Sequence, residues 1–429
     1  MPFTHNRYFK QHPRLIVGGK GAYYDLADGR HVFDCLSGLW CCPMGHAHPG
    51  IVKAVQEQVE TLDFSPSFQM GHPPAFSLAA RIARMAKLPD GRVFFVNSGS
   101  EAVDTALKVA IAYHRARGEA SRFRIIGRER GYHGVGLGGI SVGGIAPNRK
   151  AFAPLMMSGV DHLPHTYSPK DMAYSKGQPE WGAHLAEELE RLVALHDAST
   201  IAAVIVEPMQ GSTGVIVPPR GYLERLREIC TKHGILLIFD EVITGFGRLG
   251  KPFGSEYFGV SADLTTFAKA VTNGVVPMGG VIVRPEIYEA FMSGPAHAIE
   301  LFHGYTYSGH PLAVAAGHAS LDALESEGLM ERAATLAPVL ERAVHALRGE
   351  PNVVDIRNIG LTAAIELAPI AGQPGERALK LFLRALDEGL LVRFTGDIIA
   401  LAPPFISTQA QIEDMAEALR RCLRSLPTH

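Results

Sequence analysis

The chain has few features that would direct it to an oxidising compartment, a membrane or a nucleic acid. Its five cysteines (Cys35, Cys41, Cys42, Cys230 and Cys422) are odd in number and irregularly spaced, so neither a disulfide framework nor a metal site is predicted. The 41 Lys and Arg residues balance 43 Asp and Glu, whereas nucleic-acid and membrane-surface proteins usually present a basic face. The N-terminus lacks the apolar stretch of a signal peptide, and no run approaches the roughly 20 apolar residues of a membrane span. We therefore expect a cytoplasmic protein without a membrane, nucleic-acid or metal partner.

The order of hydrophobic patterns predicts an α/β fold. Short β-rich runs alternate with helical periods in the middle of the chain, which is typical of a mainly parallel sheet with helices on both faces. Strands are expected at 93–96, 124–127, 201–206, 235–239 and 264–268, with an amphipathic helix ending before Gly234. Helices at 312–326 and 331–348, strands near Ile356 and Leu390, and a last helix from Ala410 follow. We predict an N-terminal segment (1–50) that joins a small α+β domain (311–429), and a large domain (51–310) between them.

Charged residues come directly after three of the expected central strands. Glu207 follows IAAVIV, Asp240 follows ILLIF and Lys269 follows LTTFA. The steps between them are 33 and 29 residues, about one βαβ unit each. Charges often end strands simply because the chain leaves the core, but three at matched spacing favour a shared site. In a parallel sheet they would meet at the edge where doubly wound folds bind ligands.

A phosphate site is predicted near the same edge. The strand VFFV runs into NSGSEAVDTALK, a small-residue loop that opens into a helix. The free N–H groups and dipole of a helix start attract anions, and Ser98, Gly99 and Ser100 would contribute hydroxyls and close backbone approach. Serine followed by glutamate at a helix start is also a common capping arrangement. The position beside Lys269 favours a cofactor phosphate.

Two other phosphate motifs do not fit. Gly134, Gly136 and Gly139 match the dinucleotide motif G-x-G-x-x-G, but they follow a turn, and we expect no helix in GGISVGG. ILLIFDE resembles the acidic strand of P-loop ATPases, yet the P-loop motif itself does not occur in the sequence.

Several motifs together resemble the class III aminotransferases that use pyridoxal 5′-phosphate (PLP) and have fold type I. The resemblance covers nearly the whole chain and is carried by LSGLW, NSGSEAVDTALK, RGYHG, VIVEPMQGSTGV, LLIFDEVITGFGR, FAKAVTNGVVPMGG and FHGYTYSGHP. The run from Asp240 to Lys269 is its most specific part. FSPSFQMGHP, VDHLPHT and LVRFTGDIIALAPPF are similar to the ω-amino acid (β-alanine):pyruvate aminotransferases.

The resemblance implies PLP as the cofactor and two catalytic residues. Lys269 would hold PLP as a Schiff base and later move a proton, and Asp240 would pair with its pyridine nitrogen. A lysine with an ordinary pKa of about 10.4 must be desolvated or already condensed to react at neutral pH. PLP acts as an electron sink only while its ring nitrogen is protonated, which a buried carboxylate supports.

The resemblance also implies the remaining cofactor contacts. Val242 and Tyr132 would cover the two ring faces, Gly99 and Ser100 would bind the phosphate, and Glu207 would form a hydrogen bond beside the ring. Thr306 would reach the phosphate of a neighbouring subunit. The complete predicted cofactor set is Ser98, Gly99, Ser100, Tyr132, His133, Glu207, Asp240, Val242, Lys269 and Thr306.

Two residues are predicted to bind substrate. The resemblance implies that Arg393 binds a substrate carboxylate, a task that suits its planar fork, and that Trp40 lies over the substrate. The plainer interpretations are a solvated surface arginine and a core aromatic residue. Gly245 and Gly309 stand where similar enzymes carry a small alkyl residue and alanine, so we hypothesise a roomier pocket that accepts longer or bulkier amines.

The predicted reaction transfers an amino group from an ω-amino acid or amine to pyruvate. Within the same cofactor class, aminotransferases that use 2-oxoglutarate (4-aminobutyrate, ornithine or diamine type) and decarboxylating or isomerising relatives are the alternatives. A PLP-binding regulator without turnover would need a DNA-binding module, for which no segment remains, and an ATPase would need the P-loop. Since Thr306 would complete a neighbour's site, we expect at least a homodimer, and a tetramer is left open.

Overall fold

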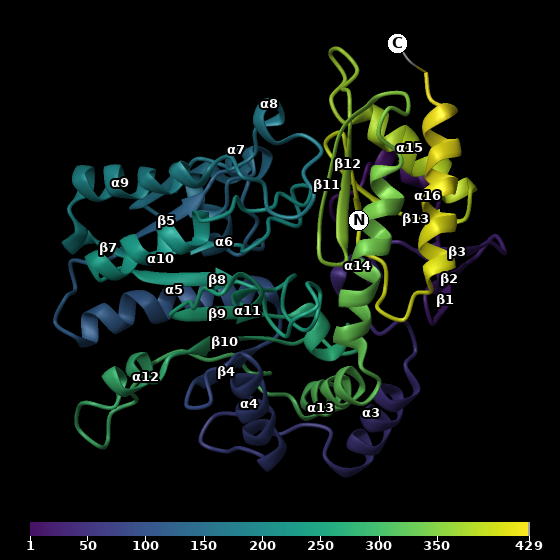
Figure 1. Cartoon of the computed structure of the whole chain (residues 1–429). Coiled ribbons are helices and arrows are strands. Elements are labelled where there is room, and N and C mark those ends of the chain that lie inside the picture. The colour runs from purple at the N-terminus through teal and green to yellow at the C-terminus, as the bar shows by residue number, and fades with distance from the viewer. Residues whose placement is uncertain (428–429) are drawn as a thin grey trace.

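A seven-stranded sheet forms the centre of the computed structural model, which describes residues 1–427 (Figure 1). Its strand order is β4-β10-β9-β8-β7-β5-β6. The strands are β4 (Arg92–Val96), β5 (Arg124–Arg128), β6 (Val160–Leu163), β7 (Ile201–Val206), β8 (Leu236–Asp240), β9 (Leu264–Phe267) and β10 (Gly279–Val283). Strands β6, β5, β7, β8 and β9 are parallel, whereas β10 is antiparallel to both of its neighbours. The predicted mainly parallel α/β fold is confirmed, and β6 and β10 are additions to the five predicted strands.

Helices cover both faces of this sheet. All six residues of β7 are buried, as expected for a strand enclosed by helices on two sides. Helix α5 (Gly99–Ala116) packs on one face, and α9 (Glu188–His196) and α10 (Tyr222–His233) pack on the other. Gly234 ends α10 in the left-handed conformation (φ 62°), so this predicted C-cap is confirmed.

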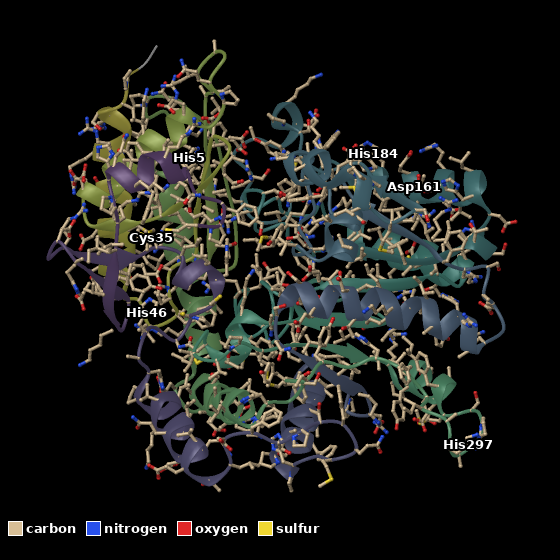
Figure 2. All side chains as sticks on the ribbon, turned by 180° about the vertical axis from the view of Figure 1, so that it is seen from behind. His5, Cys35, His46, Asp161, His184 and His297 are labelled. Carbon is tan, nitrogen blue, oxygen red and sulfur yellow. The ribbon has the colours of Figure 1, made fainter. Side chains whose placement is uncertain are left out.

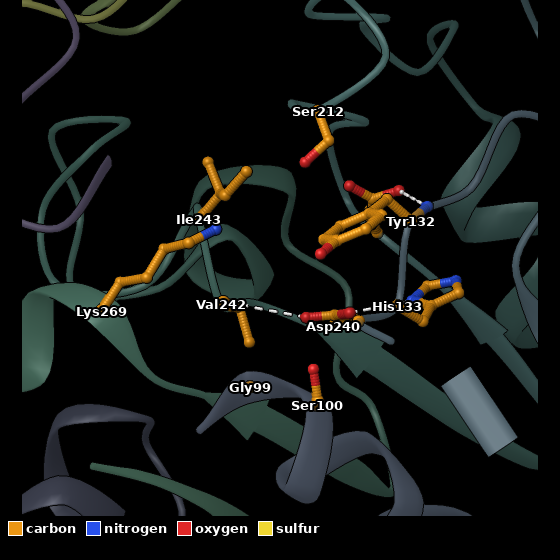
Figure 3. Close-up of a pocket in the computed structure, with 11 residues that line it drawn as sticks. Gly99, Ser100, Tyr132, His133, Ser212, Asp240, Val242, Ile243 and Lys269 are labelled. Atoms are coloured by element: carbon orange, nitrogen blue, oxygen red, sulfur yellow. Dashed lines mark hydrogen bonds and ion pairs between the residues drawn. The ribbon is translucent and has the colours of Figure 1, made fainter. Parts of the chain in front are cut away.

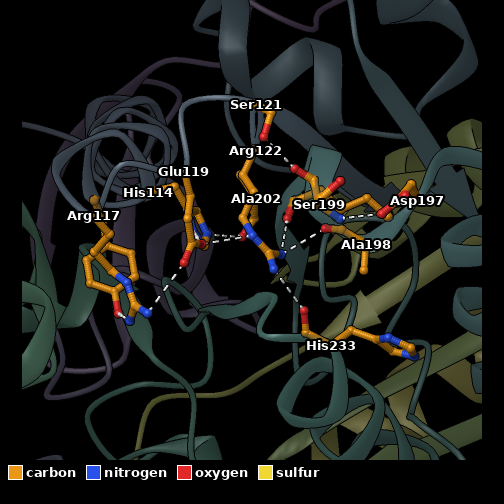
Figure 4. Close-up of polar contacts among 12 residues, drawn as sticks. His114, Arg117, Glu119, Ser121, Arg122, Asp197, Ala198, Ser199, Ala202 and His233 are labelled. Atoms are coloured by element: carbon orange, nitrogen blue, oxygen red, sulfur yellow. Dashed lines mark hydrogen bonds and ion pairs between the residues drawn. The ribbon is translucent and has the colours of Figure 1, made fainter.

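Arg122 fixes the end of the sheet that lies away from the strand-end charges. Its guanidinium donates to the carbonyl oxygens of Ala198 (2.8 Å), Ile201 (3.1 Å) and His233 (3.3 Å) (Figure 4). These three carbonyls belong to the segments that enter β7 and leave α10. The side chain therefore holds the starts of neighbouring strands together, which leaves the opposite edge available for a site.

The two ends of the chain pair with each other. Strands β1 (Ile16–Lys20), β2 (Tyr23–Leu26) and β3 (His31–Asp34) form a sheet whose fourth member is β13 (Leu390–Leu391), parallel to β3. From behind, His5, Cys35 and His46 lie on the side of the C-terminal region, away from Asp161 and His184 (Figure 2). The division into segments 1–50, 51–310 and 311–429 stays a prediction, and this pairing is the feature that favours it.

The C-terminal region adds a third sheet and four helices. Its antiparallel sheet has the order β11-β12-β15-β14, with β11 (Val353–Ile359), β12 (Thr362–Leu367), β14 (Arg393–Thr395) and β15 (Ile398–Leu401). The helices are α13 (Pro311–Ser326), α14 (Leu329–His345), α15 (Glu376–Asp387) and α16 (Gln409–Arg424). The predicted helices match α13, α14 and α16, and the strands predicted near Ile356 and Leu390 match β11 and β13, within a few residues, whereas β12, β15 and α15 were not predicted.

Shorter or peripheral helices complete the described chain: α1 (Asn6–Gln11), α2 (Ser37–Trp40), α3 (Pro49–Thr61), α4 (Pro73–Met85), α6 (Leu137–Val142), α7 (Ala146–Phe152), α8 (Pro169–Met172), α11 (Gly254–Phe258) and α12 (Pro285–Phe291). Within residues 1–427, no helix has the length and apolar character needed to cross a membrane. The cytoplasmic location stays a prediction.

Candidate active site

The three strand-end charges line one cavity at the carboxyl edge of the central sheet. Asp240 is the last residue of β8, Glu207 directly follows β7, and Lys269 lies two residues after β9. The complete lining is Gly99, Ser100, Tyr132, His133, Gly134, Glu207, Ser212, Asp240, Val242, Ile243 and Lys269 (Figure 3). Eight predicted cofactor residues therefore come together here: Gly99, Ser100, Tyr132, His133, Glu207, Asp240, Val242 and Lys269.

Lys269 is an amine held inside the protein. Its residue begins a short 3-10 helix (Lys269–Thr272) in a left-handed backbone conformation (φ 53°). Burial lowers the pKa of its amine, the Arg393 charge adds to this effect, and Cys41, Asp240 and Glu207 oppose it. A lowered pKa raises the neutral, nucleophilic fraction at a given pH.

Asp240 is a buried carboxylate fixed by three donors. One oxygen lies 2.8 Å from Nδ1 of His133, and the other accepts hydrogen bonds from the Thr266 hydroxyl (3.1 Å) and the Val242 N–H (3.2 Å). Hydrogen bonds of this kind hold a carboxylate in one orientation. Nε2 of His133 is buried and has no protein partner among the described residues.

Glu207 has a different environment from Asp240. One of its oxygens accepts the backbone N–H of Tyr132 (2.9 Å), and its own carbonyl accepts a hydrogen bond from Arg128 (2.7 Å). Burial raises the pKa of the Glu207 carboxyl to about 7, and the Asp240 charge adds to the shift while His133 opposes it. Two buried carboxyl groups thus share the cavity.

The start of α5 fits an anion. Ser98 is the N-cap and accepts the Glu101 N–H (3.2 Å), while Glu101 accepts the Asn97 N–H (2.8 Å). The capping interpretation is therefore right for Ser98, which does not line the cavity. Gly99 and Ser100 occupy the first helical turn, where N–H groups lack an intrahelical partner. A Cβ at residue 99 would lie 3.1 Å from Val242, so glycine keeps this end of the cavity open.

Gly134 lines the cavity, and Gly136 and Gly139 follow it in the segment that packs on α5. The expectation that no helix follows them is wrong, because α6 spans Leu137–Val142. The segment packs on α5, where Ser100 Oγ accepts the Val135 N–H (3.1 Å) and Asp104 accepts the Gly139 N–H (2.9 Å). Side chains at 134, 136 or 139 would collide with Ser100, Asp104 or the His133 carbonyl, which explains the glycines without a dinucleotide.

The two predicted substrate residues lie outside the cavity lining. Trp40 is 2% exposed and belongs to the same apolar cluster as Ile243. Arg393 begins β14 and is half-buried, and burial lowers the pKa of its guanidinium. Burial also raises the pKa of the Tyr132 hydroxyl, and the Arg393 charge opposes that shift, so Arg393 acts on the cavity electrostatically.

Thr306 and the two unusual glycines lie elsewhere. Thr306 is exposed in the loop that precedes α13. A Cβ at Gly245 would meet the Glu241 carbonyl (2.9 Å) and Phe253, and Gly309 lines a separate groove beside Phe95. Neither glycine lines the Lys269 cavity within one chain, and the hypothesis of a roomier pocket stays a prediction.

Sequence reasoning missed several residues of the site. Ser212 and Ile243 line the cavity, and Thr266 holds Asp240. Ser212 and Ile243 lie inside the motifs VIVEPMQGSTGV and LLIFDEVITGFGR. Their closeness in sequence to Glu207 and Val242 could have predicted that they line the cavity. Cys41 and Cys42 are half-buried free thiols.

Comparison with known proteins agrees with this geometry. The family described as "Aminotransferase class-III" matches residues 5–423. The chain belongs to the class-III aminotransferases. It is 57% identical to an omega-aminotransferase of Caulobacter vibrioides over 99% of this chain and 96% of that one, and 51% identical to a beta-alanine–pyruvate aminotransferase of Pseudomonas aeruginosa over 99% and 95%.

A solved structure extends the comparison to the fold and the cofactor. The structure of an amine transaminase from an uncultivated Pseudomonas species, in its PLP-bound form, superposes with a TM-score of 0.91 at 35% identity, covering 99% of this chain and 97% of that one. This aminotransferase therefore has fold type I, and its family depends on PLP. The residues present fit that group: a buried amine, a buried carboxylate and a helix start with free N–H groups surround one cavity.

Proposed function

We propose that this aminotransferase moves the amino group of an ω-amino acid or amine to pyruvate, which yields an aldehyde or keto product and alanine. The observation that carries the proposal is Arg393, a half-buried guanidinium at the start of β14 whose charge acts on the pKa of both Tyr132 and Lys269. Burial lowers the pKa of this guanidinium, and its planar fork suits a substrate carboxylate. The names of the two curated relatives support the ω-amine and pyruvate assignments.

The chain's own residues divide the work. PLP, when bound, supplies an electron sink that stabilises negative charge on the substrate carbon. Lys269 provides the amine to which the cofactor attaches and afterwards the base that moves a proton at the substrate carbon. Asp240 places a fixed negative charge against the pyridine nitrogen. Val242 and Tyr132 orient the ring, and the N–H groups of Gly99 and Ser100 hold the phosphate.

The remaining groups control the environment of that chemistry. Because the pKa of Glu207 is about 7, its carboxyl is mostly neutral at lower pH and can donate or accept a hydrogen bond beside the ring. Ile243 and Val242 close the apolar side of the cavity and exclude water. Arg393 fixes the carboxylate end of a keto acid or ω-amino acid and so sets the distance from that carboxylate to the reacting carbon.

A donor and acceptor panel tests this function. Purified enzyme is given β-alanine, 4-aminobutyrate, putrescine and simple amines, each with pyruvate or with 2-oxoglutarate, and alanine and glutamate are quantified. We expect alanine with several ω-amines and little glutamate. Glutamate as the main product would replace the proposal with the 2-oxoglutarate alternative, and CO₂ release would indicate a decarboxylase.

We also propose a homodimer, because an apolar surface surrounds the Thr306 loop. Phe68, Phe76 and Tyr307 are 59%, 69% and 58% exposed, and Phe302 is 90% exposed. Phe68 and Phe76 line a groove together with Gly304 and Gly309, close in sequence to Thr306. Exposed apolar groups gathered in this way are typical of a protein interface. A second copy on this surface would bring Thr306 to the neighbouring site.

Charge introduced into this surface tests the dimer. The double variant Phe68→Glu/Phe76→Glu should sediment as a monomer, since burying two unpaired carboxylates is unfavourable, and activity should fall with it. Phe152→Glu, at a half-exposed aromatic residue on α7, is the control that should leave the mass unchanged. A wild-type monomer would contradict the proposal, and a tetramer would extend it.

A further inference from the structure

Arg248 is a buried cation that has no role in the proposed reaction. It lies in the loop after β8, eight residues beyond Asp240, and is 2% exposed. Its hydrogen bonds go to uncharged oxygens: Ser37 Oγ (3.0 Å), the Pro403 carbonyl (2.9 Å) and, at 3.5 Å, the Leu361 carbonyl. Burial lowers its pKa to about 9, opposed by the Asp34 charge. Burying a charge without an ion-pair partner is costly, so an arginine kept here needs a compensating role.

The segment that Arg248 contacts is strained. Ser37, Gly38, Leu39 and Trp40 all have positive φ (49°, 54°, 62° and 71°), a left-handed turn in which three residues are not glycine. L-residues other than glycine adopt this conformation only at a cost in free energy. The turn therefore depends on contacts from elsewhere in the chain.

Those contacts come from both sides of the turn. Asp34 accepts the Leu36 N–H (3.0 Å) and the Gly38 N–H (2.6 Å). The Ser37 hydroxyl donates to the Ala402 carbonyl (2.7 Å) and accepts from Arg248. Asp34 is local to the turn, whereas Arg248 connects the turn to the strand that carries Asp240.

Trp40, the last residue of the turn, contacts Arg248 and belongs to the apolar cluster that contains Ile243, which lines the cavity. The Arg248 guanidinium carbon lies over the ring of Trp40 (5.9 Å) and over the ring of Phe405 (4.7 Å). Burial raises the pKa of the Cys41 thiol, and the Lys269 charge opposes that shift. The indole Nε1 of Trp40 is buried without a partner among the described residues.

We propose that Arg248 is a positioning residue that holds the left-handed turn Ser37–Trp40 and thereby fixes Trp40 in the apolar cluster that it shares with Ile243, a residue of the cavity lining, so that its loss weakens binding of the amine substrate. The inference rests on the proposed function for its substrate, but its structural part stands on the turn alone. Arginine suits the task because its planar fork bonds Ser37 Oγ and Pro403 simultaneously while stacking on aromatic rings. Lysine would keep the charge and lose this geometry.

Trp40 itself reports on the turn. The chain contains two tryptophans, Trp40 and Trp181, so Trp181→Phe leaves Trp40 as the single indole. In that background we expect Arg248→Lys to shift the holoenzyme emission to longer wavelength and to increase acrylamide quenching. KM for the amine should rise about tenfold with kcat changed less than about threefold, and the visible absorbance of the bound cofactor should remain. Unchanged emission and unchanged KM would overturn the inference.

Two further variants separate positioning from general stabilisation. Arg332 donates to the carbonyls of Phe405 (2.8 Å) and Ser407 (2.8 Å) but not to the turn, so Arg332→Lys is the matched control. Leu39 is 58% exposed, and Leu39→Gly removes left-handed strain without disturbing the core. Added to Arg248→Lys, it should restore part of the emission and of KM. Equal effects from Arg332→Lys, or no rescue by Leu39→Gly, would contradict the proposal.

A last variant covers the case in which Arg248→Lys does not fold. Ser37→Ala removes the hydroxyl that accepts from Arg248 and should move emission and KM in the same direction by a smaller factor. No movement in that variant would overturn the inference. If wild-type enzyme transfers no amino group between any tested pair, the proposed function fails, while the emission experiment still decides whether Arg248 holds the turn.

Discussion

The cofactor side and the substrate side of this site are built in different ways. On the cofactor side, Glu207, Asp240 and Lys269 lie at or just beyond the ends of adjacent parallel strands, at one edge of a continuous sheet. On the proposed substrate side, Trp40 and Arg393 come from opposite ends of the sequence, which pair through β3 and β13. The first arrangement follows from sheet topology, and the second from packing between distant segments.

This difference bears on how such an enzyme changes during evolution. Altering a strand-end residue removes a group that the proposed chemistry needs. Altering the segment around Trp40 changes contacts among loops and leaves the sheet intact. We therefore expect the cofactor side to determine whether transfer occurs at all, and the substrate side to determine which amine is used.

The largest effect is expected at Lys269. Lys269→Ala removes the attachment point and the base, so transamination should fall by at least about 10³-fold and the visible absorbance of the bound cofactor should be lost. The protein should remain folded. Burial lowers the pKa of this amine, which means that the charged amine does not stabilise the folded state. Initial rates, absorbance spectra and thermal unfolding measure the three effects.

An exposed lysine supplies the control for that variant. Lys53 has a side chain that is 75% exposed, and Lys53→Ala should keep wild-type rate and colour. A Lys269→Ala protein that kept its colour and rate would contradict the assignment of Lys269 as the residue that holds the cofactor.

The sequence predicted the cofactor side because its signals are local. A hydrophobic run followed by a charge places Glu207, Asp240 and Lys269 at one edge once the strands are parallel, and five strands were located from such runs. The direction of β10 has no local signal, and neither has the left-handed turn, in which Gly38 is the single glycine of four residues. The distance of Trp40 and Arg393 from the cavity depends on contacts between residues that are hundreds of positions apart in the sequence. The local spacing of hydrophobic residues carries no information about such contacts.

A smaller, selective effect is expected at Arg393. Arg393→Met keeps much of the side-chain volume but removes the fork, so KM for β-alanine and pyruvate should rise by about 10- to 100-fold. Amines that lack a carboxylate should be affected much less in their own half-reaction. Single-turnover measurements with each donor separate the two cases.

Arg384, an exposed residue of α15, gives the matched control. Arg384→Met should change neither class of substrate. Equal losses for carboxylate and non-carboxylate donors in Arg393→Met would mean that the arginine supports the fold of the substrate side without selecting its ligand.

The smallest effect concerns how the stability of the cofactor side depends on pH. Burial raises the pKa of Glu207 from 4.5 to about 7, so its contribution to stability is complete below pH 4.5 and is lost as the pH rises through about 7. One pKa unit corresponds to about 1.4 kcal/mol, so the loss is about 3 kcal/mol.

Glu207→Gln cannot ionise, and its free energy of unfolding should fall less over this range than that of the wild type. Denaturant titrations of cofactor-free protein at pH 5, 6, 7 and 8 measure the difference, with Glu224→Gln, at an exposed position of α10, as control. Parallel pH profiles for wild type and Glu207→Gln would mean that Glu207 is solvated like a surface carboxylate. The contrast between a buried cofactor side and a substrate side built from loops would then depend on Lys269 and Asp240 alone.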